Sequence, residues 1–348
     1  MAQLLSGPPA RDPAEVTERL LAVQAQDPRG ARLAVRARST GLTAADVDRA
    51  LTLDKTLLIT WLNRGTLHMV RSQDYWWLHR LTAKPQFQSD CYRRLARLGV
   101  TAAAADQGVQ VVERALAADG PLTRGRLADR LATSGLPSTA GAALHVLMLA
   151  NLRGIAVRGP MVGAQQAYVL VRDWLGRPPA VPDPDAALAW LARRYLAGHG
   201  PAADQDLAKW AGLPVTWARR GLNGIAAELA ERTDGLAELA GQTSVSEEVP
   251  PPRLLGAFDP LLLGWTSREQ VLSGHPEIVT SNGLFRPFAL VGGRAAGTWT
   301  YQGGDVTLDR FGPLPADVEA ALAAEAKDVR RFLATEPEPD ESGEQTGS

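Results

Sequence analysis

The feature that most constrains this chain is a pattern of helices in groups of three, each followed by a short segment in which apolar residues alternate. The middle of the sequence shows it best. Helical spacing covers residues 104–119, 123–131 and 138–152, and residues 154–171 have the pattern of two strands around a Gly/Pro turn. Three helices followed by a β-hairpin are typical of a winged helix. We therefore predict a mainly α-helical fold with small β wings, in the α+β class.

The same frame recurs farther along the chain. The first copy has Gly-Pro at 120, Leu-Ala at 127 and Gly-Leu-Pro at 135, and the second has the same three signals at 200, 207 and 212. Repetition of turn and helix signals in one order indicates a repeated structural unit. The sequence thus predicts tandem modules, with the proline-rich run at 177–184 as a linker.

We divide the chain into five parts on these grounds. In the first module we expect helices at 13–24, 28–38 and 43–51 and a wing at 57–70, and in the C-terminal region a hairpin turning at 291–294 and a helix at 315–333. The tail contains five acidic and no basic residues, which predicts disorder. The parts are winged-helix modules at 1–100, 101–182 and 183–249, a C-terminal β-hairpin and helix region at 250–334, and the tail at 335–348.

Charge is distributed unevenly. The formal net charge is -1, which by itself argues against a polyanionic partner, but residues 1–100 contain 15 basic against 9 acidic residues. No stretch has the length and apolarity of a signal or membrane-spanning segment, and a lone cysteine, Cys91, can form neither an internal disulfide nor a zinc cluster. We expect a cytoplasmic protein without a metal or a membrane partner.

The segment from Leu20 to Arg38 contains the strongest chemical signal. Within one helix Gln24 and Gln26 would point about 200° apart. Asp27 and Pro28 are good N-cap and first-turn residues, however, so a helix break here would let the two carboxamides converge. The helix that follows places three arginines at spacings of three and four, which suits a phosphate backbone, although such a stripe is also typical of a solvated face. These arginines are Arg29, Arg32 and Arg36.

Five segments resemble the helix-turn-helix family of DNA glycosylases that has AlkZ-like and YcaQ-like branches. The resemblance covers most of the chain and implies a C-shaped scaffold of tandem winged helices. It identifies Gln24 and Gln26 as the catalytic Gln-x-Gln signature, and the amide at the second position favours the AlkZ-like branch, whose members serve antibiotic self-resistance. The segments are VQAQDPRGA (23–31), TWLNRGTLHMV (60–70), the 200–214 stretch, AFDPLLLGW (257–265) and NGLFRPFALVGGRAAGTW (282–299).

The resemblance also implies a substrate and a reaction. The expected substrate is double-stranded DNA with a bulky N7-alkylated purine, and an interstrand crosslink is a further expected target. An alkylated purine is already a good leaving group, so two amides that orient a water and a developing sugar cation are sufficient. No lysine stands in the signature to form a Schiff base, which predicts a monofunctional enzyme, and no cofactor is expected. We expect a monomer.

Further candidates for DNA contact lie outside the signature. Arg64 could reach the DNA or serve a surface turn, and His68 could do so or be a packed core residue. Arg286 and Arg294, the latter at a hairpin tip, could contact phosphates or groove edges. Asp259 precedes a proline and is expected to start a turn. Tryptophans such as Trp210 are expected in the core.

One alternative function comes from another class of protein. A winged-helix regulator would bind DNA or a drug without chemistry. Such a protein normally dimerises on a palindromic site and inserts a recognition helix into the major groove. The basic front of the chain and the Gln-Ala-Gln turn favour the enzyme.

Overall fold

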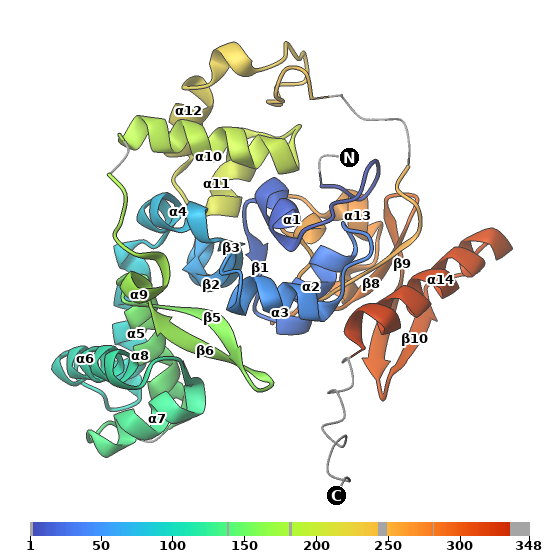
Figure 1. Cartoon of the computed structure of the whole chain (residues 1–348). Helices are drawn as coiled ribbons and strands as arrows, with labels where there is room; N and C mark the ends of the chain where they lie inside the picture. Colours follow the sequence, from blue (N-terminus) through green and yellow to red (C-terminus); the bar gives the residue numbers. More distant parts are fainter. Residues whose placement is uncertain (1–2, 138, 181–182, 243–248, 281, 335–348) are drawn as a thin grey trace, which may run out of the picture.

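The computed structural model describes residues 3–137, 139–180, 183–242, 249–280 and 282–334, so the predicted disordered tail lies outside the described residues. Figure 1 shows the arrangement of its elements. The first hundred residues contain α1 (Pro13–Leu20), β1 (Val23–Gln24), α2 (Pro28–Arg36), α3 (Ala44–Thr52), β2 (Leu57–Leu62), β3 (Thr66–Arg71), α4 (Tyr75–Thr82) and α5 (Pro85–Arg97).

The two repeated helix groups and the C-terminal region follow in order. The second group contains α6 (Ala102–Asp119), β4 (Leu122–Thr123), α7 (Arg124–Thr133), α8 (Ala140–Leu152), β5 (Ala156–Val162), β6 (Gln165–Leu170) and α9 (Val171–Leu175). The third contains α10 (Pro184–His199), α11 (Asp204–Ala211) and α12 (Val215–Asn223). The C-terminal region contains β7 (Arg253–Leu255), α13 (Glu269–Leu272), β8 (Phe288–Val291), β9 (Arg294–Gln302), β10 (Asp305–Arg310) and α14 (Ala316–Leu333).

Most predicted helices and strands are confirmed, because the signals that define them, such as helix N-caps, act between residues close in sequence. N-cap side chains accept backbone N–H groups at the starts of several helices, among them Asp12, Asp27, Thr43, Thr101 and Thr123. The predicted wing at 57–70 forms β2 and β3, and the predicted turn at Gly292-Gly293 joins β8 to β9. Helices α4 and α5 had not been predicted.

One prediction at the site is wrong. The helix expected at 13–24 ends at Leu20, because Leu21 has a φ of 63° and the chain becomes extended. Val23 and Gln24 then pair with Met69 and His68 as a short edge strand, and the backbone N–H of Ala25 donates to Leu67 O at 2.8 Å. Tertiary strand pairing therefore replaces the last helical turn.

The predicted wings of the first two modules belong to one sheet. Its strand order is β1-β3-β2-β5-β6-β4, and the pairing of Ile59 with Arg158 joins the wing of the first module to that of the second. A second, four-stranded sheet has the order β10-β9-β8-β7. The division of the chain into modules stays a prediction, since this continuous sheet crosses the boundary at residue 100.

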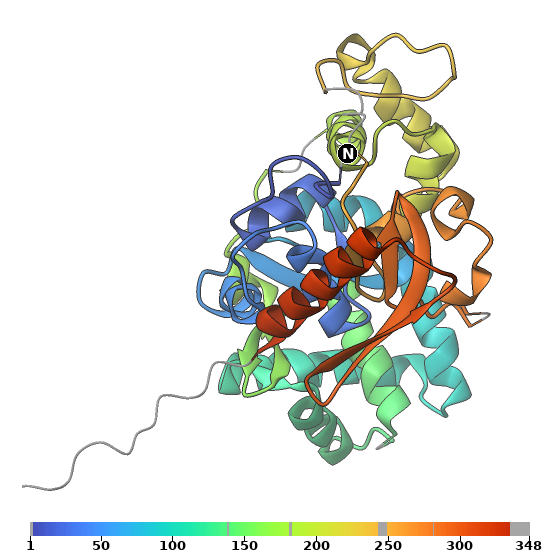
Figure 2. The same cartoon turned by 90° about the vertical axis from the view of Figure 1, so that its right-hand side faces the viewer.

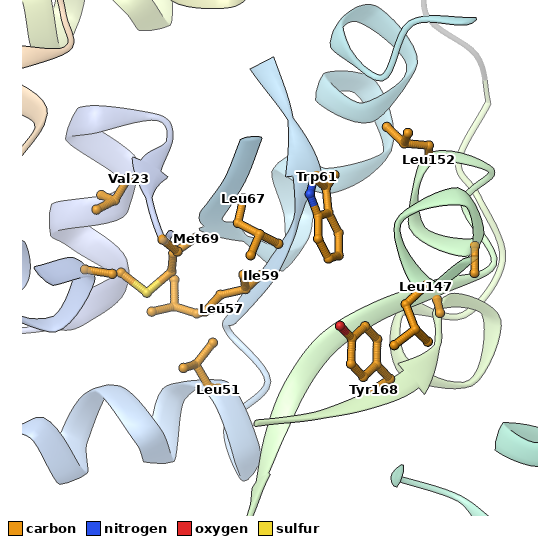
Figure 3. Packing of buried hydrophobic residues seen from close by; sticks show 14 of the residues in the cluster. Val23, Leu51, Leu57, Ile59, Trp61, Leu67, Met69, Leu147, Leu152 and Tyr168 are labelled. Carbon is orange, nitrogen blue, oxygen red and sulfur yellow. The ribbon is translucent and has the colours of Figure 1, made fainter. Parts of the chain in front are cut away.

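The first sheet has a different environment on each face. Figure 3 shows Val23, Met69 and Ile59 among the buried apolar residues of the main core, toward which Leu51 points from α3. Residues directly opposed in antiparallel strands share a face, and alternate residues point to opposite faces. Gln24, His68 and Thr60, each one residue along from these core residues, therefore lie on the other face.

The C-terminal region packs against α2. Gly30 of α2 lies so close to the 256–258 segment that an added Cβ would meet Ala257 O at 2.3 Å. Helix α14 runs across the outer side of this region and contacts β7 and β10 (Figure 2). Thus the segment that follows the Gln-Ala-Gln motif is held by residues more than two hundred positions away.

Among the described helices, none is long and apolar enough to cross a membrane.

Candidate catalytic site and nucleic-acid interface

The two glutamines lie at the edge of the first sheet, Gln24 in its edge strand and Gln26 in the bend that follows. Gln24 is the last residue of β1, and Gln26 comes directly before Asp27, the N-cap of α2. A continuous helix, in which residues two apart would point about 200° apart, is therefore replaced here by a strand and a bend. Gln24 is 7% exposed and Gln26 is exposed. The motif thus combines one anchored carboxamide with one that is accessible to a ligand.

The start of α2 adds an electrostatic feature beside Gln26. The Asp27 side chain accepts the backbone N–H groups of Arg29 and Gly30 at 2.8 and 2.9 Å, and Pro28 occupies the first turn, as predicted. The N-terminal end of a helix carries a partial positive charge. Gln26 therefore lies where an anionic backbone would be favoured.

Arg64 reaches Gln24 from the turn between β2 and β3. Its Nη2 donates to Gln24 Oε1 at 3.2 Å, and its Nη1 donates to the carbonyl oxygen of Trp210 in α11. Burial, and then the positive charge of Arg268, lower the pKa of Arg64 to about 10, so the guanidinium stays protonated at neutral pH. Arg64 therefore connects the turn between β2 and β3 to the end of α11 and to Gln24.

His68 lies opposite Gln24 in the sheet and is 2% exposed. Burial, and then the charge of Arg64, lower its pKa to about 3, so the ring is neutral. Its Nδ1 lies 3.0 Å from Thr66 O, and since a carbonyl only accepts, Nδ1 must bear the proton. A neutral buried imidazole has no charge with which to attract a phosphate.

The arginine stripe of α2 is divided between solvent and interior. Arg29 is exposed, lies over the Tyr301 ring at 5.2 Å and donates to Tyr301 O at 3.3 Å. Arg32 is buried in an ion pair with Asp48, and Arg36 is buried against carboxylates of α14. Of the three, only Arg29 is on the surface.

The remaining predicted arginines lie in the C-terminal region. Arg286 is exposed ahead of β8, and Arg294 is exposed at the start of β9, where its Nη1 donates to Ser273 Oγ at 3.3 Å. In the described part of the chain, no hydrogen bond or ion pair connects either residue to Gln24 or Gln26. The structure thus brings Gln24, Arg64 and His68 together, places Gln26 and Arg29 beside them along α2, and leaves these two arginines apart.

An aromatic cluster that was not predicted adjoins the site. The Phe258 and Phe285 ring centroids are 5.2 Å apart, and the guanidinium of Arg268 lies 5.2 Å from the Phe285 ring. Arg268 is close enough to lower the pKa of Arg64, and Phe258, with a φ of 57°, follows the residue that packs on Gly30. The motif AFDP was visible in the sequence, but a positive φ at a phenylalanine has no sequence signal.

Two predictions of a structural role, for Asp259 and Trp210, are confirmed. Asp259 caps the short turn after it, accepting Leu261 N at 2.9 Å, and it also forms a fully buried ion pair with Arg38. Trp210 is buried at 4% exposure, whereas Trp190 and Trp217 are nearly half exposed and depart from the expectation of core tryptophans. Within the described ranges, no group of three His, Cys, Asp or Glu side chains could hold a metal ion.

Comparisons with known proteins place these features in context. The family described as "DNA glycosylase AlkZ-like" matches residues 17–332. The chain is 28% identical over 347 residues to an "Interstrand DNA cross-link repair glycosylase" of Streptomyces sahachiroi, covering 91% of each sequence. It is also similar to the solved structure of the Streptomyces sahachiroi DNA glycosylase AlkZ, with a TM-score of 0.73, 27% identity, and coverage of 95% of this chain and 93% of that one.

Proposed function

This chain belongs to the AlkZ-like family of DNA glycosylases, and from that premise we propose that Gln24 and Gln26 catalyse hydrolysis of the N-glycosidic bond of a bulky N7-alkylated purine in double-stranded DNA. The enzyme is a DNA glycosylase, as its family and its named relative show. The lesion, the two catalytic residues and the DNA contacts form the proposal.

The observation that carries the proposal is the contrast between the two carboxamides. Gln24 is buried and accepts a hydrogen bond from Arg64. Gln26 is exposed, beside the N-terminal end of α2 with its partial positive charge. An N7-alkylated purine is cationic and leaves readily, so little general-acid catalysis is required. Two amides that orient a water molecule and stabilise positive charge on the sugar are chemically sufficient.

We extend the proposal to interstrand crosslinks. A crosslinked base is tied to the partner strand and cannot be rotated fully into a closed pocket, which is how many glycosylases act. The exposure of Gln26 suits a substrate that stays in the duplex. The relative from Streptomyces sahachiroi is named for crosslink repair, which supports the same assignment. We further propose that the enzyme serves self-resistance to a genotoxic product.

We assign the proposed DNA contacts to those candidate residues whose side chains are exposed to solvent. Arg29, Arg286 and Arg294 present their side chains to solvent and are proposed to contact phosphates or groove edges. Arg32, Arg36 and His68 are buried within the protein and are proposed to support the site from behind. We propose that the enzyme acts as a monomer in the cytoplasm, on chromosomal DNA.

The winged-helix regulator is less well supported by the same structure. A recognition helix needs a polar face that is free to enter the major groove. Helix α8, the third helix of its group, is apolar apart from His145 and Asn151 and packs against both α5 and α6. In α12, Arg219 and Arg220 are paired with Asp204 and Asp185.

The decisive test uses duplexes with N7-alkylguanine adducts of increasing size, including an N7-linked interstrand crosslink. Abasic sites are scored after heating with alkali, and strand cleavage before that step is expected to be absent. Gln24→Ala and Gln26→Ala are expected to lower the single-turnover rate by about 100-fold or more. The matched control is Gln110→Ala, at an exposed glutamine of α6, which is expected to retain the full rate.

The outcomes separate the parts of the proposal. Full activity in both signature variants would remove the catalytic assignment. Absence of product from every adduct, with retained DNA binding, would favour the regulator. Activity on monoadducts but not on the crosslinked duplex would restrict the substrate to monoadducts.

A further inference from the structure

Arg64 is partly exposed, but its guanidinium is directed at acceptors within the protein. Its guanidinium is held between two modules: Nη1 donates to Trp210 O at the end of α11, and Nη2 donates to Gln24 Oε1. Carbonyl groups at the C-terminal end of a helix carry partial negative charge, which favours a cation there. The protein itself therefore supplies the acceptors that a DNA phosphate would otherwise provide.

The backbone conformation of Arg64 is also unusual. Arg64 has a φ of 59° and a ψ of 12°, in the left-handed region that residues other than Gly, Asn and Asp seldom adopt. Gly212, just past α11, packs against it so closely that an added Cβ would lie 2.8 Å from Arg64 N. Strained positions persist where the surroundings hold them, and they gather at functional sites.

The hydrogen bond to Gln24 has a definite chemical consequence. A guanidinium can only donate, so the oxygen of the Gln24 carboxamide must face Arg64. This fixes which atom points where in a side chain that could otherwise turn its amide over. The two N–H groups of Nε2 are then directed away from Arg64, and Oε1 is polarised by a positive charge. The orientation needed for catalysis is set before any substrate binds.

Resting on the proposed function, we propose that Arg64 is a positioning residue: held by the end of α11, it fixes the carboxamide orientation of Gln24 rather than contacting DNA. The third module thereby controls the geometry of a catalytic group in the first. The neutral ring of His68, on the same face of the sheet, adds no competing charge.

The test separates rate from affinity. In the full-length protein, Arg64→Ala and Arg64→Met are expected to lower the single-turnover rate of base release by about 100-fold, because misplacement of a catalytic group by about 1 Å has that effect. Affinity for undamaged duplex, and its dependence on salt, should stay unchanged. Arg64→Lys keeps one donor and is expected to give an intermediate rate. Arg172→Ala, which removes an exposed arginine of α9, is the matched control for loss of one positive charge.

A double-mutant cycle identifies the partner. If Arg64 acts through Gln24, the Gln24→Ala variant has nothing left to position, and adding Arg64→Ala should change its rate by less than about 3-fold. A merely structural role would lower the rate again in that background and reduce the midpoint of urea unfolding. Each variant is therefore also unfolded in urea, and the midpoint is expected to fall much less than the rate.

Three results would overturn the proposal. Weaker DNA binding with a log–log salt slope smaller by about 1 in Arg64→Ala would identify a phosphate contact. A normal rate in Arg64→Ala, with Gln24→Ala inactive, would remove Arg64 and leave the catalytic assignment intact. Full activity in Gln24→Ala would remove the catalytic role of Gln24 itself and this inference with it.

Discussion

The two ends of α2 differ in solvent exposure, although arginines occur at both. At the N-terminal end, Gln26 and Arg29 are exposed and face solvent. Just past the C-terminal end, Arg38 is completely buried against Asp259, and Arg36 in the last turn is buried against Glu325. Gln26 and Arg29 at the N-terminal end are accessible to a ligand, whereas the arginines at the C-terminal end are sealed by the C-terminal region.

The difference shows that partners distant in sequence decide what an arginine does. The partners of Arg36 and Arg38 lie 289 and 221 residues away. Helical spacing placed Arg29, Arg32 and Arg36 on one face, but it held no information on which carboxylates would cover that face. The sealed end, at Arg36 and Arg38, holds α2 in a fixed position. The open end, at Gln26 and Arg29, can therefore present its side chains in a defined place.

The largest effect is expected at the sealed end. Arg38→Ala should lower the free energy of unfolding by about 3–5 kcal/mol, because it leaves Asp259 buried and unpaired. Urea unfolding measures the loss. The double variant Arg38→Met with Asp259→Leu should recover much of it, since no unpaired charge remains. An Arg38→Ala protein as stable as the parent would show that the two ends of α2 do not differ as described.

Sequence reasoning identified the elements of this region better than its contacts. Asp27 and Pro28 correctly predicted where α2 begins, because capping is local. The strand at Val23–Gln24 was taken for helix, since its pairing with β3 depends on residues more than forty positions away. Likewise, nothing in the turn at Arg64 indicates that Trp210 O would be its acceptor. The sequence indicated both glutamines and Arg64 as candidates, but it did not indicate the hydrogen bond between Arg64 and Gln24.

Low pH is expected to reduce the stability of the protein through a buried histidine near each end of α2. Burial lowers the pKa of His68, near the open end, and of His199, near Arg38, to about 3. The unfolded chain binds these protons below about pH 6.5 and the folded chain does not, so stability is complete above that pH and falls as pH decreases toward 3. Each histidine should contribute a slope of up to about 1.4 kcal/mol per pH unit.

Urea unfolding between pH 5 and 7, above the carboxylate range, checks this prediction. His199→Phe keeps an aromatic ring beside Tyr195, on which His199 stacks at 4.8 Å, and removes the titrating group. The slope of stability against pH should then decrease and not disappear, because His68 remains. An unchanged slope would contradict the assignment to His199.

A smaller effect is expected within the open end. Gly30→Ala should destabilise the protein by about 1–3 kcal/mol, because its Cβ would overlap Ala257 O. Helix propensity alone predicts the opposite sign, a gain of about 1 kcal/mol. A thermal or urea midpoint that rises in Gly30→Ala would show that α2 is not tightly packed on the 256–258 segment.

The smallest effect on stability is expected at Arg29. Arg29→Ala should change the free energy of unfolding by less than about 0.5 kcal/mol, since the side chain is exposed. It should nonetheless weaken binding to undamaged duplex and reduce the log–log salt slope by about 1, as loss of one phosphate contact does. Fluorescence anisotropy over a range of salt concentrations measures both. Unchanged binding would limit the open end to the glutamines.

The sealing of α2 by late residues affects how the protein is made. A ribosome synthesises Arg36 and Arg38 first, and their carboxylate partners emerge 289 and 221 residues later. A chain stopped early therefore carries guanidinium groups whose buried setting does not yet exist. Such a fragment should be a substrate for cellular proteases, so that only chains that contain Asp259 and Glu325 are left to act on the genome.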